Sequence, residues 1–111
     1  MSNLTRENVI ADMEEAAERM GLDLEDLQEM IVDVIDDCLS KAKLLLKAVG
    51  EKSASDIKSI AHDIKGASAN YGLLSPSALA LKLEKSCDDP STAVAEELVA
   101  DFDQLKALNL A

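Results

Sequence analysis

Apolar residues recur every three or four positions along most of this 111-residue chain, and strict alternation is nowhere sustained. Such spacing places them on one face of an α-helix, whereas a half-buried strand would show a period of two. The chain has four glycines and two prolines, too few for a turn-rich sandwich or barrel. The sequence therefore predicts an all-α fold. The longest apolar face comprises Leu24, Leu27, Ile31, Val34, Ile35, Cys38, Ala42, Leu45, Leu46 and Val49.

Glycine, proline and capping residues divide the chain into five predicted helices. Gly21 is a natural C-terminal stop, and Ser53, followed by Asp56, resembles a capping box. Ser75-Pro76 and Asp89-Pro90 each combine a cap with a proline suited to the first helical position. The predicted helices cover 6–20, 24–49 after a cap at residue 23, 53–71, a segment from the cap at residue 75 to about 86, and a last segment that begins at the cap at residue 89.

The links between these helices are short, which makes consecutive long helices antiparallel neighbours. Tyr71 and Phe102 are the only aromatic residues, so the core has to be mainly aliphatic. A chain of this length corresponds to a single domain, residues 1–111. The predicted architecture is an up-down antiparallel four-helix bundle with a short extra N-terminal helix. The inner face of the last helix is predicted to comprise Val94, Leu98, Phe102 and Leu105.

The net charge, the apolar runs and the two cysteines disfavour several classes of partner and of site. Twenty-two acidic and eleven basic residues give a net charge of −11, which disfavours binding to nucleic acid and to anionic membranes. No apolar run is long enough for a membrane span, and the N-terminus lacks a secretory pattern. Cys38 and Cys87 lack metal-ligand spacing and are expected to be buried free thiols. We expect a cytoplasmic monomer, and the initial Met1 favours a free-standing chain.

His62 is the only histidine, so metal sites and Ser-His-Asp triads have little support. It lies in the third predicted helix, roughly opposite a stripe of apolar residues, and is therefore expected to face solvent. An exposed imidazole is a competent nucleophile near neutral pH, because much of it is uncharged there. The stripe comprises Ile57, Ile60, Ile64, Ala67 and Tyr71.

The neighbours of His62 on the same helix face suit a phosphate. Lys58 and Lys65 lie four residues before and three residues after it, so both ammonium groups are on its side. Gly66 lies one turn on, at a mid-helix position where glycine costs about 1 kcal/mol relative to alanine. Together with Ala69 it leaves space for an approaching partner. Phosphoryl transfer needs mainly positioning and charge neutralisation, and the partner can bring magnesium and a carboxylate acceptor.

Residues 61–72, AHDIKGASANYG, resemble the core motif of histidine-containing phosphotransfer (HPt) domains, and Leu79, Leu83 and Glu84 continue the match. The resemblance implies that His62 is phosphorylated at Nε2, that Lys65 stabilises the phosphoryl group and that Gly66 permits close docking. Gly72 would serve the turn and its packing. It also implies that the partners are receiver domains of response regulators or hybrid histidine kinases, which exchange phosphate through an aspartate.

Two departures from the family pattern concern the surroundings of the motif. Pro76 stands where the family commonly has leucine, and the second helix lacks the aromatic residues of many members. In an antiparallel pair, His62 should lie level with the region around Lys41. Leu44, which points away from the core stripe, is then a candidate hydrophobic contact for a partner, with Lys41 and Lys43 beside it.

Other functions remain as alternatives to a phosphorelay carrier. The main one is a non-catalytic acidic helical adaptor whose exposed histidine is incidental. An acyl carrier would need an Asp-Ser-Leu attachment site, and Asp23-Leu24-Glu25 has no serine. The calcium-loop pattern is absent, as is the glycine-rich loop of an autonomous ATP-dependent kinase. We expect no cofactor or metal on this chain, with magnesium supplied by the receiver.

Overall fold

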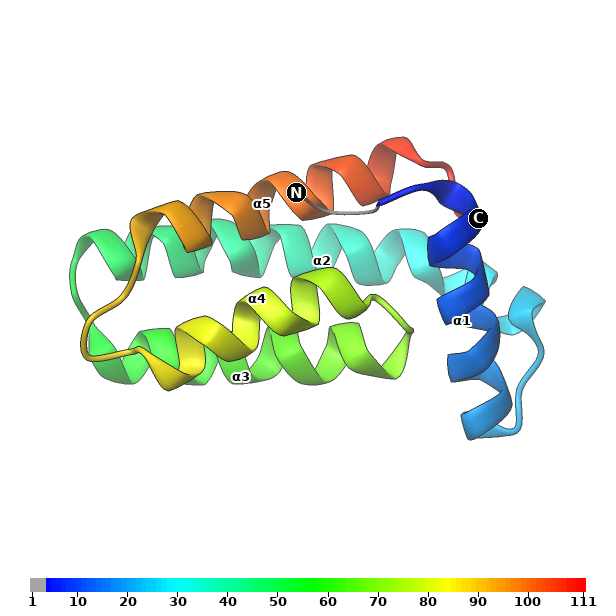
Figure 1. Ribbon diagram of the computed structural model, residues 1–111, viewed down its shortest axis with the longest axis horizontal. Coiled ribbons are helices and arrows are strands. Elements are labelled where there is room, and N and C mark those ends of the chain that lie inside the picture. Colours follow the sequence, from blue (N-terminus) through cyan, green and yellow to red (C-terminus); the bar gives the residue numbers. More distant parts are fainter. Residues whose placement is uncertain (1–3) are drawn as a thin grey trace.

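The computed structural model describes residues 4–111, and over this range the chain forms five α-helices and no strand. Helices α2 to α5 run alternately up and down and enclose a common core, while α1 lies across one end (Figure 1). This confirms the predicted fold class, although α1 is not short: its 15 residues exceed the 12 of α4. The helices are α1 Arg6–Met20, α2 Leu24–Gly50, α3 Ala54–Asn70, α4 Leu74–Lys85 and α5 Thr92–Ala107.

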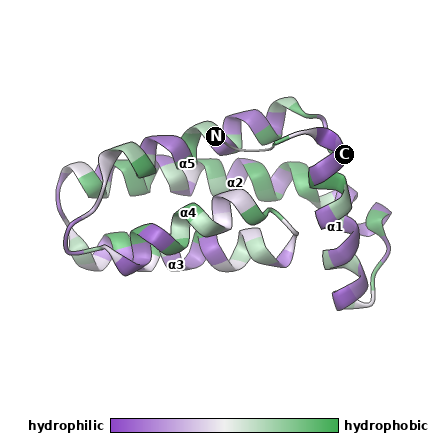
Figure 2. Ribbon diagram, viewed as in Figure 1, coloured by the Kyte–Doolittle hydropathy of each residue, from purple (hydrophilic) through white to green (hydrophobic). Residues whose placement is uncertain are grey.

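The core is aliphatic apart from Phe102, which is fully buried. α3 packs against α2 and α4, and α5 against the same two helices, so the four close into a bundle. Hydrophobic bands recur along the helices between hydrophilic ones (Figure 2), as expected for amphipathic helices around one core. No helix in the described part of the chain has both the length and the apolar character needed to cross a membrane. The largest fully buried side chains include Met13, Leu27, Ile31, Leu45, Ile57, Ile64, Leu83, Leu98 and Leu105.

The predicted ends of α1 and α2 agree with the structure. The Thr5 hydroxyl accepts a hydrogen bond from the Asn8 backbone N–H, and Gly21 ends α1 with a left-handed φ of 70°. α2 begins after Asp23, whose backbone N–H donates to the Asp26 carboxylate. Ser53 does cap α3, but its hydroxyl donates to the Asp56 carboxylate instead of accepting from the helix backbone.

The predicted caps of α4 and α5, Ser75 and Asp89, are each two residues away from the observed ones, Leu73 and Ser91. α4 begins at Leu74, so Pro76 is the third helical residue, a position whose N–H has no partner within the helix. Proline is therefore tolerated there without marking the start. The Ser75 hydroxyl instead donates to Asp101 of α5, a carboxylate that is 2% exposed and whose pKa burial raises. α5 begins after Ser91, whose hydroxyl accepts from a backbone N–H in the first turn.

The buried face of α3 is rotated relative to the predicted stripe. Its buried residues are Ile57, Ala61, Ile64 and Ser68, whereas Ile60, Ala67 and Tyr71 are only partly buried. The prediction missed this because Ala61 and Ser68 are too small or too polar to count as strong apolar positions.

The two cysteines also differ from each other. Cys38 is buried in α2, and burial raises the pKa of its thiol. Cys87 follows the end of α4 and is only partly buried, which corrects the expectation that both thiols are buried.

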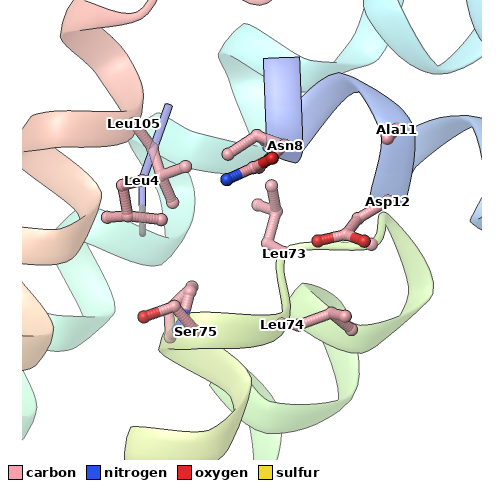
Figure 3. A pocket seen from close by; sticks show the side chains of 11 residues that line it. Leu4, Asn8, Ala11, Asp12, Leu73, Leu74, Ser75 and Leu105 are labelled. Carbon is pink, nitrogen blue, oxygen red and sulfur yellow. The ribbon is translucent and has the colours of Figure 1, made fainter. Parts of the chain in front are cut away.

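α1 is held against the turn between α3 and α4. Gly72 of this turn has a φ of 78°, and a Cβ there would clash with the backbone of Asp12 and Met13 in α1. Only glycine allows both the conformation and this close approach. Beside the contact is a hollow of about 380 Å³, where Asn8 and Asp12 lie near Leu73 of the turn and Ser75 in the first turn of α4 (Figure 3).

Candidate functional site

His62 lies on the outer face of α3, and its side chain is 65% exposed. This agrees with its expected orientation, even though the buried stripe of α3 is rotated. The imidazole is at one side of a shallow depression of about 490 Å³ on the protein surface. The residues that line this depression are Ser55, Lys58, Ser59, His62, Asp63 and Glu84.

Glu84 connects His62 to Lys65. One carboxylate oxygen, Oε2, is 2.9 Å from His62 Nδ1, and the other, Oε1, is 2.7 Å from Lys65 Nζ. Both partners lie on α3, and the packing of α3 against α4 brings Glu84 between them. The Glu84 side chain is 16% exposed, so its carboxylate is largely shielded while the imidazole stays accessible.

The Lys65 ammonium, and after it the His62 imidazole, hold the pKa of Glu84 below its usual range. Glu84 is thus a carboxylate at neutral pH, and a carboxylate can only accept hydrogen bonds. The neutral imidazole therefore donates from Nδ1, which leaves the lone pair on Nε2. Nε2 has no hydrogen-bond partner among residues 4–111, so it is the nitrogen available to react with an incoming group.

The two lysines expected beside His62 occupy different surroundings. Lys58 is exposed and lines the depression with the imidazole. The Lys65 side chain is 30% exposed, is paired with Glu84 and does not line the depression. The lysine that lines the depression with the imidazole is therefore not the one that the sequence motif emphasises.

Gly66 and Ala69 are also placed differently from each other. Gly66 is exposed one turn after His62, and a Cβ there would have no atom within 4 Å. The surface above it is open. Ala69 is partly buried and lines a separate small hollow with Arg19 and Met20 of α1, so it is not part of the His62 depression.

None of the α2 residues expected near His62 lines its depression, and the one linked to α3 is Lys41. Lys41 pairs with Asp37 at 3.2 Å, and Asp37, with a smaller contribution from Asp63 of α3, raises the pKa of Lys41. Asp63 follows His62 directly, so this part of α2 is beside the site. Leu44, one turn further along α2, is 57% exposed, more than the other large apolar side chains of the described chain.

Other parts of the described surface offer less to a phosphate. No group of three or more His, Cys, Asp or Glu side chains within residues 4–111 is arranged to hold a metal ion. The hollow beside α1 is lined by apolar residues together with Asn8, Asp12 and Ser75, and has no cationic side chain (Figure 3).

The residue whose role the sequence did not reveal is Glu84. It was part of the recognised motif, but its contact with His62 depends on how α4 folds back along α3. Its position could have indicated this contact. Glu84 lies 22 residues after His62, on the next antiparallel helix, and directly follows the buried Leu83.

Comparison with known protein families gives a match that covers nearly the whole chain. A family model described as the Hpt domain matches residues 5–109, which include all five helices and every residue of the site. Neither the comparison with curated proteins nor the comparison with solved structures gives a significant match. The family match, the helical bundle and the exposed histidine on α3 agree with one another, and the chain belongs to the Hpt domain family.

Proposed function

We propose that this chain carries a phosphoryl group on His62 and passes it between aspartates of receiver domains. Membership of the Hpt family implies histidine phosphotransfer in phosphorelay signalling and interaction with receiver domains. The specific assignment rests on one observation: Glu84 accepts the Nδ1 hydrogen bond of His62, while Nε2 of the exposed ring has no partner among residues 4–111.

In the forward step, the Nε2 lone pair attacks the phosphorus of a receiver's aspartyl phosphate. The P–O bond to aspartate breaks as the N–P bond forms, and the aspartate leaves as a carboxylate. The imidazole becomes a cation that still donates Nδ1–H to Glu84, whose negative charge stabilises it. The reverse attack by a second receiver's aspartate restores the neutral ring.

Lysines and open surface support this transfer. We propose that two lysines offset the phosphoryl charge. Lys58 lines the depression, and Lys65 lies beside Glu84. Gly66 leaves the surface clear for the receiver, which brings the acceptor carboxylate and its magnesium. This chain needs no cofactor of its own for that chemistry.

We further propose that the receiver contacts α2 as well as α3. Leu44 offers an exposed apolar side chain near the level of His62, with Lys41 and Lys43 next to it. Ala69 lies two turns beyond His62 and would be at the edge of this contact. The protein acts as a monomer in this proposal, with one site per chain.

The test is phosphoryl transfer from labelled receiver domains to the purified protein. Label should appear on the wild type as an acid-labile, alkali-stable adduct, as expected for a phosphoramidate. His62→Gln should take up no label and should keep the helical circular-dichroism spectrum of the wild type, since His62 is exposed. Label that persists in His62→Gln would rule out the assignment. Absence of label on the wild type with every receiver and kinase tried would favour a helical adaptor.

A further inference from the structure

We propose that the corner between α1 and α2 is a second docking surface, which binds a basic amphipathic helix of another protein. Its apolar part comprises Met20, Leu22 and Met30, and we call it the methionine corner. The proposal does not depend on phosphoryl transfer. It goes beyond the proposed function because it gives this chain a partner other than a receiver domain.

The first support is that large exposed apolar side chains are concentrated in one short segment. Six such side chains are exposed in the described chain, and four of them lie within residues 20–32. Met20, Leu22 and Met30 are 43%, 41% and 39% exposed. The fourth, Val32, lines a separate hollow between α2 and α5. Isolated exposed apolar residues need no explanation, but a group of them at one place is typical of a contact surface.

The second support is that the two methionines lie against the same end of α3. Met20 lines a hollow of about 190 Å³ together with Ala69 and Asn70. The hydroxyl of the next residue, Tyr71, donates to Met30 Sδ over 3.9 Å. The end of α1 and its link to α2 lie outside the four-helix bundle (Figure 1), where a partner can reach them. Methionine side chains are flexible, so they can adapt to the apolar side chains of a partner.

The third support is the charge around the methionine corner. Residues 14–33 carry eight carboxylates, all of them on exposed residues, and a single basic side chain, Arg19. None of these carboxylates forms an ion pair with a basic side chain of residues 4–111. Lysines or arginines of a partner would offset this charge at the rim while its apolar side chains cover the methionines.

Charge complementarity determines which kind of partner fits. The methionine corner would repel the acidic face of a receiver and also an anionic lipid surface. A basic amphipathic helix fits, because its apolar residues three or four positions apart form one stripe with lysines on either side. His62 stays accessible beside such a partner, since it lies two turns before Ala69 along α3.

The probe that tests the proposal is a synthetic helical peptide about five turns long, with leucines on one face and lysines on the other. Its control has the same composition in a scrambled order without an apolar face. NMR of the methionine methyl groups and of the single histidine locates the peptide on the unphosphorylated full-length protein. We expect the methyl signals of Met20 and Met30 to shift. The signals of Met13, which is fully buried, and of His62 should stay unchanged.

A double variant tests the apolar part of the surface. Met20→Gln combined with Met30→Gln should raise the Kd of the peptide about tenfold, because both apolar anchors are removed. Leu74→Gln is the matched control, since Leu74 is 53% exposed but lies at the start of α4. It should leave the Kd unchanged. Fluorescence anisotropy of the labelled peptide measures the Kd, and circular dichroism checks that each variant keeps its helices.

A second double variant tests the acidic part. Glu18→Gln combined with Glu29→Gln should raise the Kd several-fold at low salt and less at high salt, where ions screen the attraction. Glu96→Gln combined with Asp103→Asn removes the same net charge from exposed residues of α5, and it should change the Kd little.

Four results would overturn the proposal. A wild-type Kd in the methionine variant, or equal binding of the scrambled peptide, would show that charge alone attracts the peptide. An equal effect of the α5 variant would show that the attraction has no fixed place. Shifts at His62 as large as those at Met20 and Met30 would place the peptide at the phosphotransfer site instead. These measurements use neither a receiver nor a phosphoryl group, so failure of the proposed function would be a separate result.

Discussion

Gly66 has a place in α3 that local folding does not explain. It lies in the middle of the helix, at a φ that any residue adopts, and an added Cβ would meet nothing within 4 Å. Glycine there costs backbone entropy on folding without relieving any contact inside the protein. We therefore expect the space above it to serve a partner outside the chain, which one turn from His62 would be the proposed receiver.

Replacing Gly66 should separate stability from transfer. Gly66→Ala should raise the free energy of unfolding by about 0.5–1 kcal/mol, because alanine loses less entropy in a helix. The rate of transfer should fall progressively from alanine to leucine to glutamine as the side chain fills the docking space. Urea unfolding and a receiver-transfer assay measure the two effects.

Gly50 is the matched control for Gly66. It is also helical and exposed, with no atom within 4 Å of an added Cβ, but it ends α2 and is outside the depression that contains His62. Gly50→Leu should leave transfer at the wild-type rate. If Gly66→Leu also transfers at that rate, Gly66 has no role in docking.

At the scale of helices, the sequence predicted which segments are helical and how they are ordered, but not every boundary. Apolar spacing determined α2 because its nine buried residues repeat regularly over 27 positions. The starts of α4 and α5 were misplaced because a serine or aspartate before a proline resembles a cap. Ser75 uses its hydroxyl to bind Asp101, a partner 26 residues away, and no local pattern reveals such a contact.

The contact between α1 and the α3–α4 turn depends on Gly72. Gly72→Ala should destabilise the protein for two reasons, the left-handed φ of 78° and the clash of a Cβ with the backbone of Asp12. Gly21→Ala is the comparison, because Gly21 has a similar φ of 70° but open space around it. Its cost should be only the conformational one, about 1–2 kcal/mol. Urea unfolding should show a clearly larger loss for Gly72→Ala, and equal losses would mean that α1 shifts freely to accommodate the methyl group.

At the scale of the molecule, charge is distributed unevenly. Residues 1–40 carry twelve acidic and two basic side chains, whereas residues 41–87, which include His62, carry four acidic and eight basic ones. The second half of α2, the start of α3 and the end of α4 meet at the end of the bundle away from α1 (Figure 1). A protein of net charge −11 thus has a locally basic region of its chain, residues 41–87, and this region contains His62.

The features of the site that depend on one helix could be predicted from the sequence, whereas those that depend on contacts between helices could not. The outward orientation of His62, the position of Lys58 and the open surface at Gly66 depend on helix periodicity alone, and the sequence was sufficient for them. The pairing of Lys65 with Glu84 joins two helices, so it depends on the depth and register of α3 against α4. Ala69 was placed with His62 by periodicity, but α1 folds over that end of α3 and encloses it in another hollow.

The basic region should steer the receiver toward His62. A receiver that holds an aspartyl phosphate and binds magnesium through carboxylates has an acidic active-site face, so its association with a region rich in lysine should be fast at low salt. The association rate constant should fall as ionic strength increases, because the ions screen this attraction.

Charge reversal near the site tests whether the attraction is local. Combining Lys43→Glu with Lys58→Glu should lower the association rate constant by about tenfold at low salt and by much less at high salt, where screening already weakens the attraction. Lys106→Glu changes the charge in the same direction on α5, at a residue paired with Asp36 and outside the depression. Stopped-flow mixing with a phosphorylated receiver at several salt concentrations compares the variants. Lys106→Glu could slow association as much per reversed charge as the Lys43→Glu, Lys58→Glu double variant. In that case only the net charge of −11 matters, and the local basic region does not guide docking.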